Sequence, residues 1–366
     1  MYARSVLARR ALVAALFVAA CLVAWLVRDA SAPVEHSGLR AAFGALRPEP
    51  QRPRSTALST GLSQTHMVVS VPPAPKEAPV LPQRIRAAFT GDVAIALGVG
   101  RIVASHRDPQ FPFGDVTERL REYDLLVGNF ECVVATRGEA TIREPLVAPP
   151  EAPKLLVEAG FDLVSIANNH TLDMSAAGYF EMLEKLDAAG LVHFGSTTAD
   201  HARDPIVVRE INGIRVALIG HMNREEKRAI DDVGRARKIA DIIIVFEHWG
   251  VEYALYPVRH QRLLGRTLID AGADAVIGAH AHVVQPMEVY KNRLIVYGLG
   301  NFVFSSMVRR GTHTGAVLEL DLEKQGIAAH RFRRVTIDDR GAPHWNGEPT
   351  DEPPFDPPGP RPLPAL

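Results

Sequence analysis

The sequence predicts an α/β domain over residues 84–338, arranged as a two-sheet sandwich with helices on its outer faces. Three observations lead to this fold class. Short apolar runs bounded by turn residues alternate with segments of helical periodicity. Two longer stretches, 205–220 and 315–337, have the pattern of antiparallel hairpins. The length and the ordinary apolar content are sufficient for one large core.

Seven buried strands are expected from the apolar runs, and helices fit the segments between them. The clearest helix is 175–190, in which Phe180, Leu183 and Leu186 recur at near-helical spacing and Gly190 stands at the expected end. The predicted strands are 85–91, 124–130, 161–167, 213–220, 241–249, 274–280 and 294–300.

Residues 1–28 are predicted to form a membrane anchor or signal segment. Arg4, Arg9 and Arg10 precede the uncharged run 11–27, whose length is at the lower limit of a membrane span. The positive flank predicts a single-pass protein of the bacterial cell membrane with its domain on the extracytoplasmic side. The alternatives are secretion after cleavage of a signal peptide near "ASA", 30–32, and lipid attachment at Cys21.

Two further segments lie outside the predicted domain. Residues 29–83 are rich in Pro, Ala and Arg and have no sustained apolar period, so they are expected to form a disordered linker. Residues 339–366 are rich in proline, which cannot occupy helix interiors or central strands, so a disordered tail is expected there.

Composition excludes several kinds of site. The 41 Lys and Arg residues nearly balance 42 Asp and Glu residues, so the broad basic surface of a nucleic-acid-binding protein is not expected. The chain has two cysteines, Cys21 and Cys132, in very different segments. A disulfide framework and a cysteine zinc site are therefore excluded.

Polar side chains stand at the ends of most predicted strands. In α/β folds, ligands bind beyond the carboxyl ends of the strands, so these side chains are candidates for one shared site. Taken singly, each also fits an ordinary role as a turn, cap or surface residue. Convergence from six separate strand ends is harder to explain in that way. The residues are Asp92, Asn129, Glu131, Asn168, Asn169, His170, His248, His280, His282 and Asn301.

The segment "GAHAH", 278–282, places His280 and His282 one residue apart. On an extended chain, residues two apart point to the same face, so both imidazoles are expected to reach one site. Alone, the pair equally fits two polar residues that close a strand.

The order of these residues has a counterpart in a known family. An aspartate is followed about forty residues on by a carboxylate, then Asn-His, then a lone histidine after an apolar strand, then Gly-x-His-x-His. This order resembles the calcineurin-like metallophosphoesterases and, more closely, the CapA family of poly-gamma-glutamate capsule-synthesis proteins, which share that fold. The segments that carry the resemblance are 89–93, 111–116, 127–131, 160–174, 246–253, 268–290 and 295–304.

The resemblance implies a four-layer αββα metallophosphoesterase-like sandwich with a single catalytic-type domain. It also implies two divalent metal ions, and the mixture of carboxylate, amide and imidazole donors suits Mn, Fe or Zn. His170 would be the catalytic residue, placed to donate a proton to the leaving group or to stabilise the transition state. Asp92 and His282 would hold one ion, Asn169, His248 and His280 the other, and Glu131 would bridge both.

Other polar residues are candidates for supporting or substrate contacts. Asn129, Asn168, Glu252 and Asn301 belong to the matching segments. In the segment 137–150, Arg137 and Arg143 are candidate anion contacts, but this segment is equally typical of a solvated rim.

Two positions depart from the pattern. The first motif of phosphoesterases is usually Asp-x-His, whereas Ala94 stands in the place of that histidine here. The CapA branch generally lacks the histidine too. A weaker first metal site is expected. CapA members often have proline between the last two histidines, where this chain has Ala281. That change loosens the turn but removes no ligand.

Three functions follow from the resemblance. The first is a CapA-like extracytoplasmic protein of capsule or poly-gamma-glutamate biosynthesis or export, with a hydrolase-type dinuclear metal site. Its partners would be an anionic polymer, the membrane and other capsule-synthesis membrane proteins. The second is a metal-dependent phosphoesterase or amide hydrolase unrelated to capsule, and the third is a metal-stabilised polymer-binding scaffold without turnover.

Overall fold

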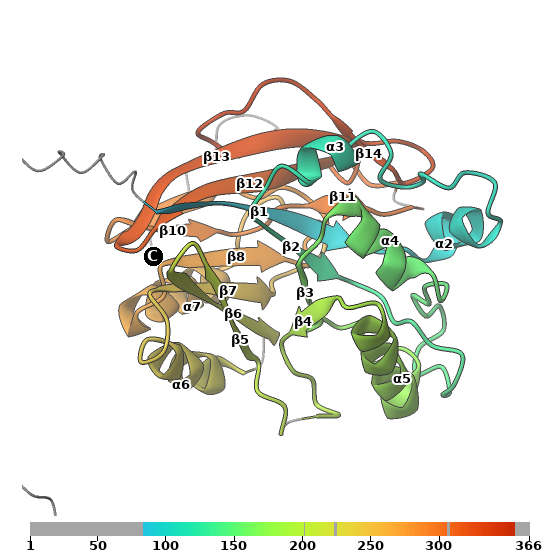
Figure 1. The fold of residues 1–366 in the computed structure, drawn as a ribbon, viewed down its shortest axis with the longest axis horizontal. Coiled ribbons are helices and arrows are strands. Elements are labelled where there is room, and N and C mark those ends of the chain that lie inside the picture. Colours follow the sequence, from blue (N-terminus) through green and yellow to red (C-terminus); the bar gives the residue numbers. More distant parts are fainter. Residues whose placement is uncertain (1–82, 201, 223–224, 306–307, 356–366) are drawn as a thin grey trace, which may run out of the picture. The chain divides into compact units, whose positions relative to one another are not determined.

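The computed structural model describes residues 83–200, 202–222, 225–305 and 308–355, all within the compact unit Lys76–Leu366 (Figure 1). The predicted membrane anchor or signal segment (1–28) and the predicted linker up to residue 82 lie outside the described residues. Among the residues that are described, no helix is long and apolar enough to span a membrane.

Two β-sheets form the centre of the domain. The first sheet has the strand order β14-β13-β12-β1-β2-β3-β4, with β11 also paired to β1. Strands β1 to β4 are parallel to one another, and β12 to β14 continue the sheet in antiparallel fashion. Its strands are β1 (Arg84–Val93), β2 (Leu125–Phe130), β3 (Leu163–Ser165), β4 (Val192–Phe194), β11 (Asn301–Val303), β12 (Thr314–Glu323), β13 (Gly326–Ile337) and β14 (Pro343–Trp345).

The second sheet has the order β5-β6-β7-β8-β10-β9. Its four central strands are parallel, and β5 and β9 close the two edges as antiparallel partners. The strands are β5 (Ile206–Ile211), β6 (Ile214–Met222), β7 (Ile242–His248), β8 (Ala275–Ala279), β9 (Met287–Tyr290) and β10 (Arg293–Val296). Both predicted hairpins are confirmed, since β5 pairs with β6 and β12 with β13.

Three hydrophobic clusters define four layers. In β1, Phe89 faces the core between the two sheets, whereas Ala88 faces the outer cluster of the first sheet, as alternation along a strand requires. The outer cluster of the first sheet includes residues of α2 (Leu97–Ala104), α3 (Thr117–Leu120), α4 (Ala152–Ala159) and α5 (Ser175–Ala188). Helices α6 (Glu226–Ala236) and α7 (Arg259–Ala271) cover the second sheet (Figure 1). The predicted αββα sandwich is therefore confirmed.

Helix α5 forms where it was predicted, but its buried face differs from the prediction. Tyr179, Met182 and Leu186 are buried in the core, whereas Phe180 is 46% exposed. The observed stripe follows the i, i+3, i+7 spacing of a helix, and a strict three-residue repeat drifts away from one face. Phe180 instead lies edge-on against Tyr179, with 5.1 Å between the ring centroids.

The domain does not end at residue 338, so the predicted start of the disordered tail is wrong. Strand β14 pairs with β13, and Thr350 exchanges backbone hydrogen bonds with Phe332 at 2.7 and 2.8 Å. Phe355 packs edge-on against Tyr256, with centroids 5.3 Å apart. Proline is compatible with this arrangement because Pro343 is the first residue of a strand at the sheet edge. Residues 356–366 lie outside the described residues.

Candidate metal centre

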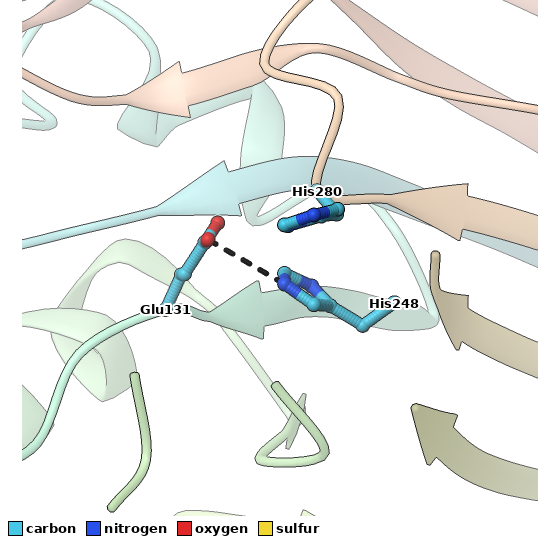
Figure 2. A group of neighbouring side chains, drawn as sticks. All are labelled: Glu131, His248 and His280. Carbon is cyan, nitrogen blue, oxygen red and sulfur yellow. Dashed lines mark ion pairs between the residues drawn. The ribbon is translucent and has the colours of Figure 1, made fainter. Parts of the chain in front are cut away.

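The carboxyl ends of β1, β2, β7 and β8 bring one cluster of buried polar side chains together. Two groups of side chains have their potential ligand atoms within 4.8 Å of one another. The first consists of Glu131, His248 and His280, whose side chains point toward one another in Figure 2. The second consists of Asp92, Glu131 and His282. Glu131 belongs to both groups, which is the arrangement that the sequence resemblance implies for a bridging ligand.

A break in the regular pairing of β1 lies next to Asp92. The register of β1 with β2 shifts between Phe89 and Asp92, and such irregularities change the direction of the side chains that follow. Gly91 lies against the backbone of Gly300, where a Cβ atom would be only 1.9 Å from the carbonyl oxygen. The fold therefore requires glycine at this position, directly before the metal-competent Asp92.

The two histidines of "GAHAH" reach the cluster from a bend and not from an extended strand. Strand β8 ends at Ala279, and His280 and His282 have φ values of 87° and 57°. The predicted extended geometry is therefore wrong. Residues other than glycine seldom adopt this left-handed conformation, which places strain beside the site. The two imidazole centroids are 6.3 Å apart, and the backbone N–H of His280 donates to Asp92 Oδ2 at 3.2 Å.

The two carboxylates of the cluster have opposite electrostatic environments. Burial raises the pKa of Asp92, but its hydrogen bond with His282 and the charge of that imidazole outweigh burial and lower the pKa to about 2. Burial, followed by the charge of Asp92, holds the pKa of Glu131 well above its usual range. Without a bound cation, the second carboxylate of the pair is therefore costly to ionise.

The imidazoles of the first group are held in the neutral form. Burial, followed by the neighbouring His280, places the pKa of His248 well below its usual range, and burial also lowers the pKa of His280. Neutral imidazole is the form that binds metal ions. Asn169 Oδ1 lies 2.6 Å from His248 Nε2, so its amide oxygen is available to the same group.

The residues present fit a divalent metal. Glu131 Oε1 is buried and has no hydrogen-bond partner among the described residues, and the same is true of His280 Nδ1. Glu131 Oε1 lies 3.6 Å from His248 Nε2 and 3.9 Å from His282 Nε2. Buried polar atoms without partners are costly, so a cation between these ligands would satisfy them.

Asparagine side chains fix the ligands in position. Asn129 Nδ2 donates to Asp92 Oδ1 at 2.9 Å, and Asn168 Nδ2 donates to Asn129 Oδ1 at 3.2 Å. Asn301 Oδ1 lies 3.0 Å from Nδ1 of His282, and a proton on that nitrogen leaves Nε2 free to bind a metal. The structure thus brings the three predicted supporting asparagines to the cluster.

His170 lies beside the cluster and is oriented by a residue that the sequence analysis missed. His170 Nε2 is 4.0 Å from Glu131 Oε1, and its Nδ1 is 2.8 Å from Asp173 Oδ2. The same carboxylate oxygen accepts a hydrogen bond from the backbone N–H of Leu146 at 2.8 Å. Asp173 is 1% exposed. The His-x-x-Asp spacing in "HTLD" is the feature of the sequence that could have indicated Asp173 as the partner of His170.

The remaining candidates lie outside the cluster. Arg137 forms ion pairs with Glu181 and Glu184 of α5, so its charge is already neutralised. Arg143 is exposed. Glu252 is also exposed, but its charge contributes to the raised pKa of Glu131.

Comparison with known proteins gives the same family as the sequence motifs. The family model for the bacterial capsule synthesis protein PGA_cap matches residues 86–306. The PGA biosynthesis protein CapA of Bacillus subtilis (strain 168) is 32% identical over 279 residues, which are 69% of this chain and 71% of that protein. The capsule biosynthesis protein CapA of Bacillus anthracis is 29% identical over 272 residues, 67% of this chain and 66% of that protein.

Solved structures show more distant similarity. A structure described as a novel phosphatase from Mycoplasma pneumoniae has 12% sequence identity and a TM-score of 0.48, over 71% of this chain and 96% of that one. The match of the family model to more than half of the chain, together with the similarity to the Bacillus subtilis protein, establishes the family. This chain belongs to the bacterial capsule synthesis protein PGA_cap family.

Proposed function

We propose that this protein acts on poly-gamma-glutamate, or a closely similar anionic polymer, during capsule assembly or export, and that it hydrolyses a bond of that polymer at a dinuclear metal centre. The observation that carries the proposal is Glu131, a buried carboxylate shared by two groups of ligands, with one oxygen that lacks a hydrogen-bond partner in the described chain. The relatives named for capsule and PGA biosynthesis support the polymer as substrate.

In this proposal, Asp92 and His282 would hold one divalent ion, Asn169, His248 and His280 would hold the other, and Glu131 would be shared by both. Bound Mn, Fe or Zn would lower the pKa of water and neutralise the negative charge that builds on a carbonyl or phosphoryl oxygen.

His170 has a different role from the ligands. Its Nδ1 contacts the buried Asp173, so its Nε2 faces Glu131 and the space in which the scissile bond would be held. We assign to His170 Nε2 the proton that the leaving group requires, and Asp173 holds the ring in the orientation that delivers it.

Hydrolysis is tested by loading the purified chain with manganese and supplying an oligo-gamma-glutamate and, in parallel, a generic phosphodiester. We expect metal-dependent cleavage of the gamma-glutamyl substrate that His280→Ala abolishes and that the exposed His260→Ala leaves intact. Cleavage of the phosphodiester alone would favour a phosphoesterase unrelated to capsule. Binding of the polymer without turnover of either substrate would contradict hydrolysis and indicate a scaffold. The scaffold role is favoured by Ala94, which stands in the place of the usual metal-binding histidine.

The cellular location is part of the proposal. The charge pattern of residues 1–28 supports a single membrane anchor with the domain on the extracytoplasmic side. A reporter fused after residue 83 should be active only outside the cytoplasm and should remain with the membrane fraction. Reporter activity in the cytoplasm would contradict the proposed orientation, and release into the medium would indicate signal cleavage.

A further inference from the structure

Two arginines lie next to the metal centre on the segment that follows β11. The amide of Asn301, which contacts His282, also donates to the backbone oxygen of Thr312 at 3.0 Å and so ties this segment to the ligands. The guanidinium of Arg309 lies 4.7 Å from the centroid of the Tyr253 ring, and that ring is 5.8 Å from the His282 ring. Arg309 is therefore separated from a metal ligand by a single aromatic side chain.

A small cavity is lined by the residues that follow Arg309 and by those that follow His282. Its volume is about 120 Å³, and its wall includes Val283 and Val284, the two residues directly after His282. Arg310 contributes to the wall from the same segment as Arg309, and Arg334 of β13 contributes from the sheet. A guanidinium of Arg334 donates to the backbone oxygen of Pro354 at 3.5 Å, a contact that leaves its charge in place.

The charges of these arginines are not neutralised within the described chain. Arg309, Arg310 and Arg334 form no salt bridge with any described carboxylate. Neighbouring arginines of β13 behave differently, because Arg331 pairs with Glu319 and Asp321, and Arg333 pairs with Glu319 at 3.0 Å. Three guanidinium groups without a salt bridge in the described chain thus lie on the segment after β11 and on β13, and two of them share a cavity with the residues that follow His282.

We propose that Arg309, Arg310 and Arg334 form a subsite that binds carboxylates of the polymer on one side of the bond held at the metal centre. Guanidinium groups bind carboxylates through paired, charge-assisted hydrogen bonds. Each residue of a gamma-linked glutamate chain has one free carboxylate, so a chain that lies along this wall presents a series of matching anions. The subsite rests on the proposed function for the choice of polymer.

The subsite is tested by equilibrium binding of a fluorescein-labelled oligo-gamma-glutamate to the full-length chain, measured by anisotropy at two salt concentrations. We expect Arg309→Gln/Arg310→Gln to weaken binding about five- to tenfold and to reduce its salt dependence, since exposed ion pairs contribute modestly and are screened. Arg334→Gln should weaken binding separately. The control is Arg107→Gln/Arg209→Gln, which removes the same charge from two exposed positions elsewhere and should bind as the wild type does.

Three results would overturn the subsite, and they differ in what they imply for the proposed function. Equal affinity of the wild type and Arg309→Gln/Arg310→Gln rejects the subsite and leaves hydrolysis at the metal centre untouched. An equal loss in the control variant shows that the effect is only net charge. If the wild type binds neutral polyglutamine of the same length as tightly as the oligo-gamma-glutamate, carboxylate recognition is rejected. Failure of the metal-dependent cleavage assay with intact binding would reject hydrolysis alone.

Discussion

Replacing Glu131 by glutamine is expected to have opposite effects on the stability of the metal-free and the metal-loaded protein. In the metal-free protein, burial and the nearby Asp92 raise the pKa of Glu131 above its value in the unfolded chain. Such a group costs no stability below its unfolded pKa, and the cost grows as the pH rises through its folded pKa. At neutral pH and with chelator, Glu131→Gln should therefore raise the free energy of unfolding by roughly 1–3 kcal/mol. The gain is measured as a higher denaturant midpoint and should vanish near about pH 4.

With manganese the order should reverse. A ligand at a hundred times its Kd adds about 2.7 kcal/mol to the stability of a folded protein. Manganese should stabilise the wild type by this amount. It should not stabilise Glu131→Gln in the same way, because both groups of ligands share Glu131. The matched control is Glu247→Gln, since Glu247 is another buried carboxylate with an unpartnered oxygen in the described chain but belongs to neither group. Equal stabilisation of Glu131→Gln and the wild type by manganese would contradict the shared ligand.

Replacing His170 by alanine is expected to separate catalysis from metal binding. His170 belongs to neither group of ligands, so the variant should retain its metal. Turnover should fall about 10²- to 10⁴-fold, the usual contribution of a positioned general acid. The loss should be largest for substrates with basic leaving groups, because activated leaving groups depart without a proton. Elemental analysis and turnover of two substrates of different leaving-group pKa are the measurements.

Asp173→Asn provides the internal comparison for His170. Asp173 contacts His170 and the backbone of Leu146, and within the described chain it forms no hydrogen bond or ion pair with a residue of either ligand group. The amide of asparagine retains the shape of the side chain but binds the imidazole of His170 more weakly. Turnover should therefore fall less than in His170→Ala, and again most for substrates with basic leaving groups. Loss of metal from His170→Ala, or a loss of turnover that is the same for both leaving groups, would contradict the role of His170 as the proton donor.

Much of the fold could be predicted because local pattern and tertiary structure agree. The alternation of Ala88 and Phe89 between two clusters, and the hairpins β5–β6 and β12–β13, follow from residue periodicity. The buried face of α5 and the end of the domain were not predictable in the same way. Whether Tyr179 or Phe180 is buried depends on the sheet beneath the helix, and the pairing of β14 depends on an edge left open by β13.

For the candidate site too, some features could be predicted from the sequence and others could not. The identities of Asp92, Glu131, His248, His280 and His282 followed from their order along the chain, and the structure places all five in one cluster. The positive φ angles of His280 and His282 and the role of Asp173 depend on contacts between segments distant in sequence. A linear pattern contains little information about such contacts.

The most direct test is electron paramagnetic resonance of the manganese-loaded protein, because it reports whether two ions are neighbours. If Glu131 joins two metal positions, the spectrum at saturation should show spin coupling between two manganese ions per chain, and His282→Ala should convert it to the spectrum of a single isolated ion. Saturation of the wild type at one ion per chain, with an uncoupled spectrum that His282→Ala does not change, would contradict a dinuclear centre at Glu131.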